Sequence, residues 1–174
     1  MTADISTRPV SSDYAAYFER YISLVPEAAV LSVMEKQLDE VMKVFRAVPG
    51  ERESFRYAPG KWSVRQIAGH LIDAERVFGY RALCIARGEK ADLPGFDENA
   101  YVANAPFDVH PLARLADEFD LIRRSNLIML RHLAPEAWDR KGIANHNEIT
   151  VRALAYVMAG HARHHLGILA TRYA

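Results

Sequence analysis

Glycine and proline are scarce in this chain and stand in clusters, with 9 glycines and 8 prolines among 174 residues. Both residue types interrupt helices, because proline lacks an amide hydrogen and glycine loses much conformational freedom when it is ordered. The stretches between the clusters can therefore form long helices, and apolar residues recur in them at three- and four-residue steps. We expect a loose tail over residues 1–12 and a short aromatic-rich helix over residues 13–24. Four long helices should follow, over residues 27–48, 63–87, 111–133 and from 150 to near the C-terminus. No segment has a convincing strand pattern, so the sequence predicts an all-α fold.

The ends of these helices carry capping signals. Ser63 and Gln66 fit a capping box, in which the serine oxygen accepts from the amide of residue 66 and the glutamine reaches back. Thr150 is placed to cap the last helix, and Gly88 to end the helix that Ser63 opens. The boundaries of two long helices therefore follow from local chemistry.

The connection between the second and third long helices restricts how the four can pack. It spans the 22 residues 89–110 and reads as irregular, with Pro94 and Gly95 in its first half. Fully extended it reaches about 70 Å, whereas the preceding helix is only about 40 Å long. The third helix can therefore begin at the end where the second begins. We expect a four-helix bundle of up-down-down-up topology rather than simple up-down alternation.

Composition indicates a single domain over residues 1–174. Hydrophobic residues make up 50% and charged residues 25%, and a chain of this length can fold without a disulfide or a metal. Its 22 basic and 22 acidic residues cancel, so no basic surplus indicates binding to nucleic acid or an anionic membrane. The single cysteine, Cys84, excludes an intrachain disulfide, and we find no apolar signal core or 18-residue apolar run. These features predict a cytoplasmic protein.

Four of the seven histidines fall on the second and fourth of the expected long helices, where their direction can be argued. At about 100° per residue, His165 lies about 40° from His161, and His164 lies about 60° to the other side. The apolar stripe around His161 and His165 consists of Leu154, Val157, Met158, Ile168 and Leu169. His161 and His165 therefore face inward one turn apart, with Cβ atoms about 5–6 Å from each other, whereas His164 lies at the edge.

His70 on the second long helix also faces inward, about 60° from Ile67 in the apolar stripe. Glycine precedes it at position 69, as glycine precedes His161 at position 160. A glycine within a helix costs about 1 kcal/mol relative to alanine, so we expect each glycine to allow a close approach.

Two interpretations of the inward histidines remain open. A histidine on an apolar face is more often a hydrogen-bonded core residue than a ligand. Two adjacent imidazoles, however, need polar partners that an apolar core lacks, and imidazole suits zinc, copper, iron and nickel. The other histidines, His110, His132 and His146, lie in or beside connections and are interpreted as surface residues.

Three motifs in order resemble the DinB superfamily of DinB-like and YfiT-like proteins, over about residues 14–170. They are the run Trp62-Ser-Val-Arg-Gln-Ile-Ala-Gly-His70-Leu-Ile-Asp73, the run Leu93-Pro-Gly-Phe-Asp-Glu-Asn-Ala-Tyr101 and the run Gly160-His161-Ala-Arg-His-His165. The resemblance implies an up-down-down-up bundle. It also implies a divalent metal, usually zinc or nickel, on one histidine of the second helix and an HxxxH pair of the fourth. These positions match His70, His161 and His165.

The resemblance further implies an activity like that of the thiol-dependent S-transferases or the thiol-dependent isomerase in this superfamily. It also implies a homodimer, because members of the superfamily are often homodimers. Three protein ligands leave one position open, as in catalytic sites. A low-molecular-weight thiol activated there would make the protein a transferase, and activated water would make it a hydrolase. A non-catalytic metal-binding or dimerisation module is the third alternative.

Two further side chains and one segment complete these expectations. Asp73, one turn from His70, is a weak catalytic candidate, with a solvent-facing charge as the alternative; Cys84 is too far along its helix to act at the metal. The N-terminal aromatic residues either form a dimer contact or cover the core; they are Tyr14, Tyr17, Phe18 and Tyr21.

Overall fold

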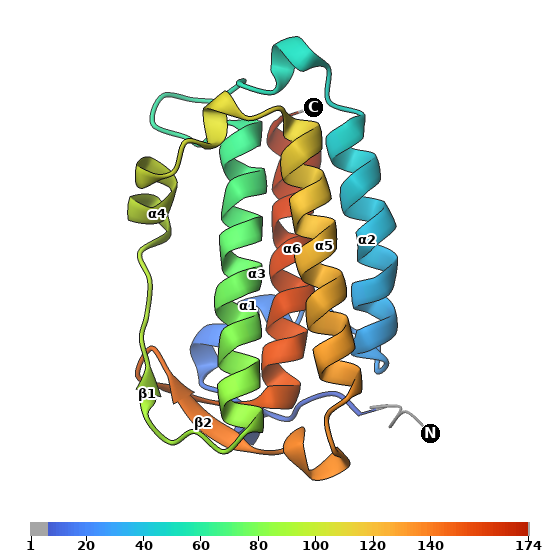
Figure 1. Cartoon of the computed structure of the whole chain (residues 1–174), viewed down its shortest axis with the longest axis vertical. Helices are drawn as coiled ribbons and strands as arrows, with labels where there is room; N and C mark the ends of the chain where they lie inside the picture. Colours follow the sequence, from blue (N-terminus) through green and yellow to red (C-terminus); the bar gives the residue numbers. More distant parts are fainter. Residues whose placement is uncertain (1–6, 174) are drawn as a thin grey trace.

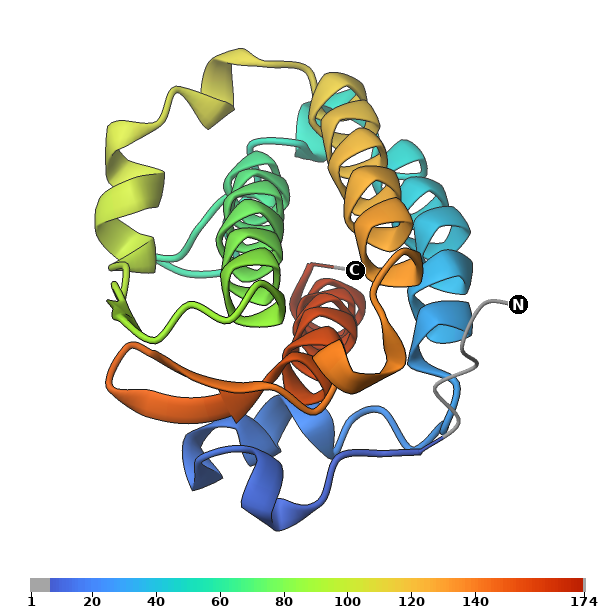
Figure 2. The same cartoon turned by 60° about the horizontal axis from the view of Figure 1, so that its bottom comes forward.

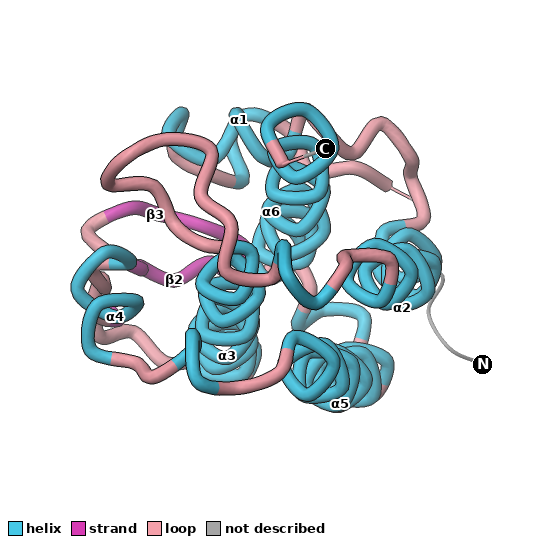
Figure 3. The backbone as a smooth tube through the Cα atoms, turned by 90° about the horizontal axis from the view of Figure 1, so that it is seen from above, coloured by secondary structure: helices cyan, strands magenta, loops and turns pink. Residues whose placement is uncertain are grey.

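The computed structural model describes residues 7–173, and most of them are helical (Figure 1). The long helices are α2 (Val30–Arg46), α3 (Val64–Ala86), α5 (Leu112–Arg131) and α6 (Val151–Arg172). Viewed along their axes, these four form a bundle in which each of α3 and α2 packs against both α5 and α6 (Figure 3). The four long helices expected from the apolar periodicity are therefore present.

The colours of Figure 1 show the direction of each long helix. Helices α3 and α5 begin at the same end of the bundle, and α2 and α6 begin at the opposite end. The chain returns from the end of α3 to the start of α5 along the outside of α3 (Figure 2). This return path contains the helix α4 (Glu98–Asn104), which Asp97 caps by accepting from the amides of Asn99 and Ala100.

The predicted helix caps are confirmed. The amide of Gln66 donates to Ser63 Oγ at 3.0 Å, and the amide of Ser63 donates to Gln66 Oε1 at 3.1 Å, which is the capping box. Thr150 Oγ1 accepts from the amide of Ala153 at the start of α6. Gly88 follows α3 with a φ of +91°, a left-handed conformation that favours glycine.

The expectation of no strands is wrong. A small sheet of order β1-β2-β3 joins β1 (Asp92–Leu93), β2 (Lys141–Ala144) and β3 (Asn147–Thr150). β1 is parallel to β2, and β2 and β3 form an antiparallel hairpin. Segments of two to four residues are too short for an alternating pattern to be recognised. The hairpin turn has Asn145 and His146 with φ of 52° and 61°, without the glycine that usually indicates such a turn.

The N-terminal segment is less helical than expected over residues 13–24. It forms two 3-10 turns and the single-turn helix α1 (Glu19–Ile22). Tyr14 forms an isolated bridge with Ile149 of β3, and the amide of Ala15 donates to the carbonyl of Glu148, so this backbone is held extended. The predicted tail of residues 1–12 lies partly outside the described residues.

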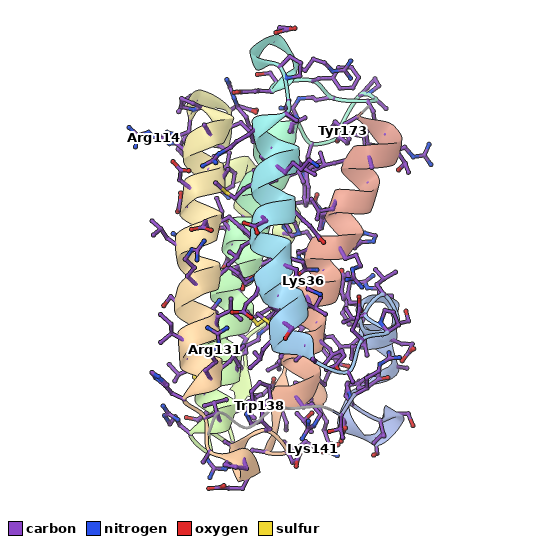
Figure 4. All side chains as sticks on the ribbon, turned by 90° about the vertical axis from the view of Figure 1, so that its right-hand side faces the viewer. Lys36, Arg114, Arg131, Trp138, Lys141 and Tyr173 are labelled. Atoms are coloured by element: carbon purple, nitrogen blue, oxygen red, sulfur yellow. The ribbon has the colours of Figure 1, made fainter. Side chains whose placement is uncertain are left out.

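Apolar side chains form most of the core between the four helices, in two clusters. Trp138 is buried at the end where α5 leads into the hairpin, and Tyr173 lies at the opposite end (Figure 4). The aromatic residue Phe18 of the N-terminal segment is also buried in this core, and Tyr21 packs against it. No helix within residues 7–173 is long and apolar enough to cross a membrane.

Candidate metal centre

Three buried histidines meet between α3 and α6. His70 comes from α3, and His161 and His165 come from successive turns of α6. Only 5%, 5% and 8% of their surfaces are exposed. One ring nitrogen of each can be chosen so that all three lie within 4.8 Å of one another. The structure therefore brings together the three histidines that helical periodicity and the family resemblance indicate.

The contacts within this cluster are short and incomplete. The Nε2 atoms of His70 and His161 are 3.0 Å apart, and the ring centroids of the three pairs are 4.6–4.9 Å apart. The Nδ1 atom of His165 is buried and has no hydrogen-bond partner within residues 7–173. A buried polar atom without a partner costs about 1–3 kcal/mol, so this arrangement needs an explanation.

Burial keeps the three imidazoles neutral. Desolvation lowers the pKa of His70 to about 4 and that of His165 to about 3, and it holds the pKa of His161 well below its usual value. The other histidines of the cluster contribute to the shift of His161 through charge repulsion. Neutral imidazole is the form that binds metal ions, so the cluster is in its ligating state at pH 7.

The cluster fits a divalent metal ion. Two nitrogens bound to a tetrahedral zinc ion at 2.0–2.1 Å lie about 3.3 Å apart, close to the 3.0 Å between His70 and His161. Three neutral imidazoles are a ligand set found in catalytic zinc sites. The cluster also leaves one buried ring nitrogen, Nδ1 of His165, without a hydrogen-bond partner among residues 7–173.

Aromatic rings enclose the cluster. The indole ring of Trp62 lies 4.8 Å from the imidazole of His70, and the ring of Phe78 lies 5.5 Å from that of His161. Tyr21 contacts the rings of both His161 and His164. These groups limit the access of water to the imidazoles and lower the local polarity.

The two glycines that precede the histidines allow the close approaches that we expected. A Cβ atom on Gly160 would collide with the backbone carbonyl of Tyr21, and one on Gly69 would collide with the ring of Phe107. Gly160 thus allows the N-terminal segment to pack directly against α6 beside His161.

A cavity of about 300 Å³ adjoins the three histidines. Its walls are formed by α3, α6, the N-terminal segment and the connection before α4, and they include His164, Tyr17, Phe96 and Arg81. Its volume is at the lower end of the range of about 300–1,000 Å³ for small-molecule sites. The histidine cluster is therefore accessible to a small organic ligand.

The remaining candidate residues lie outside the cluster. Asp73 is half-buried, its carboxylate lies 3.8 Å from the guanidinium of Arg76, and it does not line the cavity; desolvation raises its pKa. Cys84 is a half-buried free thiol in the second half of α3. His164 is exposed at the cavity wall. The three histidines that we interpreted as surface residues are also exposed; they are His110, His132 and His146.

A second buried polar cluster, which no sequence pattern predicted, joins α2, α3 and α5 beside α6. Arg123 donates from Nε and Nη2 to the two carboxylate oxygens of Glu75 at 2.8 and 2.9 Å, and from Nη1 to Gln37 Oε1 at 2.9 Å. Gln37 in turn donates to the carbonyl of Ala159, and Asn126 donates to Glu75. Arg123 stands four residues from Phe119 and from Leu127, which places its charge within an apolar stripe of the helix. This position could have predicted a buried charge from the sequence alone.

The fold and the histidine cluster together define a helical-bundle protein with a candidate metal centre. The chain belongs to the DinB superfamily, whose family profile matches residues 34–169. No curated protein matches it. Among solved structures it is similar to YfiT from Bacillus subtilis, with a TM-score of 0.73 and 18% identity over 79% of this chain and 80% of that one. That protein is described as "a probable metal-dependent hydrolase with an unusual four-helix bundle topology".

Proposed function

We propose that this protein is a metal-dependent enzyme in which His70, His161 and His165 hold one divalent ion, zinc or nickel. The observation that carries the proposal is the buried three-imidazole cluster with an unpartnered nitrogen, open to a cavity. Three protein ligands and one free position are the arrangement of catalytic rather than structural metal sites.

The first candidate reaction is the transfer of a low-molecular-weight thiol to an organic electrophile. When bound, the metal lowers the pKa of a group in its open position, which for a thiol gives a thiolate at neutral pH. The aromatic walls from Trp62, Phe78 and Phe96 support an organic cosubstrate rather than water alone. Tyr21 and His164 are placed at the wall to orient it.

The second candidate is hydrolysis, with water as the activated nucleophile. The description of YfiT as a metal-dependent hydrolase favours it, and it requires the same three ligands. A non-catalytic metal-binding or dimerisation module remains the alternative from a different class. In it the ion would have no exchangeable ligand.

The proposal includes the up-down-down-up connectivity implied by the family resemblance. The helix directions in Figure 1 and the long return path outside α3 support it.

We also propose that the protein is a homodimer, as family members often are. Since Phe18 is buried and Tyr21 packs beside His161, the aromatic segment serves to cover the core, and another surface would form the contact. A monomer in light scattering at micromolar concentration would contradict the dimer.

The test of the reaction begins with elemental analysis of protein purified without a metal-affinity tag. The protein is then loaded with Co²⁺, whose absorption spectrum reports its ligands, and titrated with a simple thiol such as 2-mercaptoethanol. We expect a thiolate-to-cobalt absorption band, followed by conjugation when an alkyl halide is added. Ester hydrolysis without a thiol requirement would instead favour the hydrolase. An unchanging spectrum and neither reaction would support the non-catalytic module.

A further inference from the structure

Arg81 is a buried cation in the wall of the cavity. It lies on α3, three turns after His70, and only 5% of its surface is exposed. Its Nη2 donates to the carbonyl of Pro94 at 2.6 Å, and Phe96 lies beside the guanidinium. Within residues 7–173 no ion pair joins Arg81 to a carboxylate. A neutral carbonyl is therefore the hydrogen-bonding partner of a buried positive charge.

This environment is unusual for a buried guanidinium. Buried charges are normally paired, because removing an ion from water costs several kcal/mol. Arg123 in the same bundle follows that rule with a bidentate carboxylate. Asp92 pairs with His146, and Glu98 at the cavity wall is exposed and forms no ion pair with Arg81 among residues 7–173.

Arg81 and the histidine cluster can contact one ligand. Both line the same cavity. Their positions on α3 are 11 residues apart, which is about 16 Å along the helix axis and close to a whole number of turns. Arg81 and His70 therefore lie on the same face of α3, which is the face that lines the cavity.

We infer that Arg81 is the anion-binding residue of this cavity and that the organic ligand carries an oxyanion, a carboxylate or a phosphoryl group, at the end remote from its reacting group. The planar guanidinium matches either group through two parallel hydrogen bonds. Arg20 at the cavity wall is exposed and its guanidinium lies over the ring of Tyr17, so it contributes attraction rather than a buried binding site. The inference rests on the proposed function for the identity of the reacting end only.

The test compares matched thiols on the metal-loaded protein by calorimetry. The probes are mercaptoalkanoates of increasing length, the corresponding mercaptoalkanamides and the corresponding mercaptoalkyl phosphates. We expect the protein to bind an anionic probe of suitable length at least about tenfold more tightly than its amide. The carboxylate and phosphate series then identify which oxyanion fits.

Variants of Arg81 assign that preference. Arg81→Met should bind acid and amide equally, whereas Arg81→Lys should keep part of the preference, because it retains the charge without the planar fork. Arg76→Met, which removes an exposed arginine from the same helix, should keep all of it. The inference is overturned if the unaltered protein binds the acid and the amide equally. It is also overturned if Arg81→Lys keeps the full preference for the acid while Arg20→Met loses that preference. If Arg81→Met does not fold, Arg81→Lys decides.

A metal-free arm separates this inference from the proposed function. Protein stripped of metal is titrated with 4-phenylbutyrate and with 4-phenylbutyramide, which carry no thiol. If the metal-free protein prefers the acid, and Arg81→Lys weakens that preference, anion binding by Arg81 is supported even if no metal is ever found. Thiol binding at the metal with no acid preference in either arm would support the proposed function and refute the role of Arg81.

Discussion

The bundle contains two buried polar clusters that differ in how completely their polar atoms are paired. The cluster around Arg123 joins complementary groups, so the guanidinium, the carboxylate of Glu75 and the amide of Gln37 all have partners. The cluster around His161 joins three groups of the same kind, and the Nδ1 atom of His165 has no partner in the described part of the chain. The first lies in the interior between the helices, whereas the second adjoins a cavity.

This difference separates a structural cluster from a binding site. A fully paired network needs nothing further and fixes how the four helices pack. The three neutral imidazoles leave the Nδ1 atom of His165 without a partner among the described residues, and they gain from an added cation. Gln37 links the two clusters, because it donates to the carbonyl of Ala159, two residues before His161. The paired cluster thus supports the helix that presents the ligands.

The largest effect that we expect concerns metal content. His161→Ala should lose most of the metal after dialysis, because two remaining imidazoles are too few to hold the ion firmly. His164→Ala should keep it, since His164 is exposed and outside the cluster. Elemental analysis of both variants measures the difference. Equal retention in every variant would mean that the histidines are ordinary core residues.

Breaking the paired cluster should instead reduce stability. Arg123→Met leaves the carboxylate of Glu75 buried without its partner, which should lower the free energy of unfolding by about 3–5 kcal/mol. Arg124→Met is the matched control, because Arg124 is an exposed residue paired with Asp120, and a change below about 1 kcal/mol is expected. Urea denaturation measures both. A loss of metal without a loss of stability in Arg123→Met would reverse the roles of the clusters.

The pH dependence of stability should reflect the histidine cluster. Above pH 6.5 its imidazoles are neutral in the folded and the unfolded chain, so their contribution is complete. Between pH 6.5 and about 4 the unfolded chain binds protons that the folded chain does not, because burial lowers the pKa of His70 to about 4. The metal-free protein should therefore lose up to about 3 kcal/mol from His70 alone on acidification. Denaturation at several pH values should give a flatter curve for His70→Gln than for the unaltered protein.

The smallest effect concerns the packing beside the histidines. Gly160→Ala places a Cβ atom against the backbone carbonyl of Tyr21, which can yield only if the N-terminal segment shifts. We expect a loss of about 1–3 kcal/mol. Gly167→Ala on the same helix meets no atom within 4 Å and should instead stabilise by up to about 1 kcal/mol. If thermal denaturation shows that both substitutions stabilise, the close contact at Gly160 has no energetic importance.

Local patterns in the sequence determined the long helices, their caps and the direction of the histidines. Helical periodicity acts over three to four residues, so His161 and His165 could be placed on one face without knowledge of the rest of the chain. The glycines before His70 and His161 likewise predicted close approaches, although not which residues approach.

Only the tertiary structure decided the features that depend on distant partners. Strand β1 exists because Asp92 and Leu93 lie beside residues 143 and 144, about fifty positions later in the chain. Arg123 finds Glu75 across 48 positions and Gln37 across 86. Arg81, by contrast, finds no carboxylate among the described residues. A sequence pattern shows that a charge lies on a buried face, but only the assembled bundle determines whether that charge is paired, because pairing depends on which helix packs opposite.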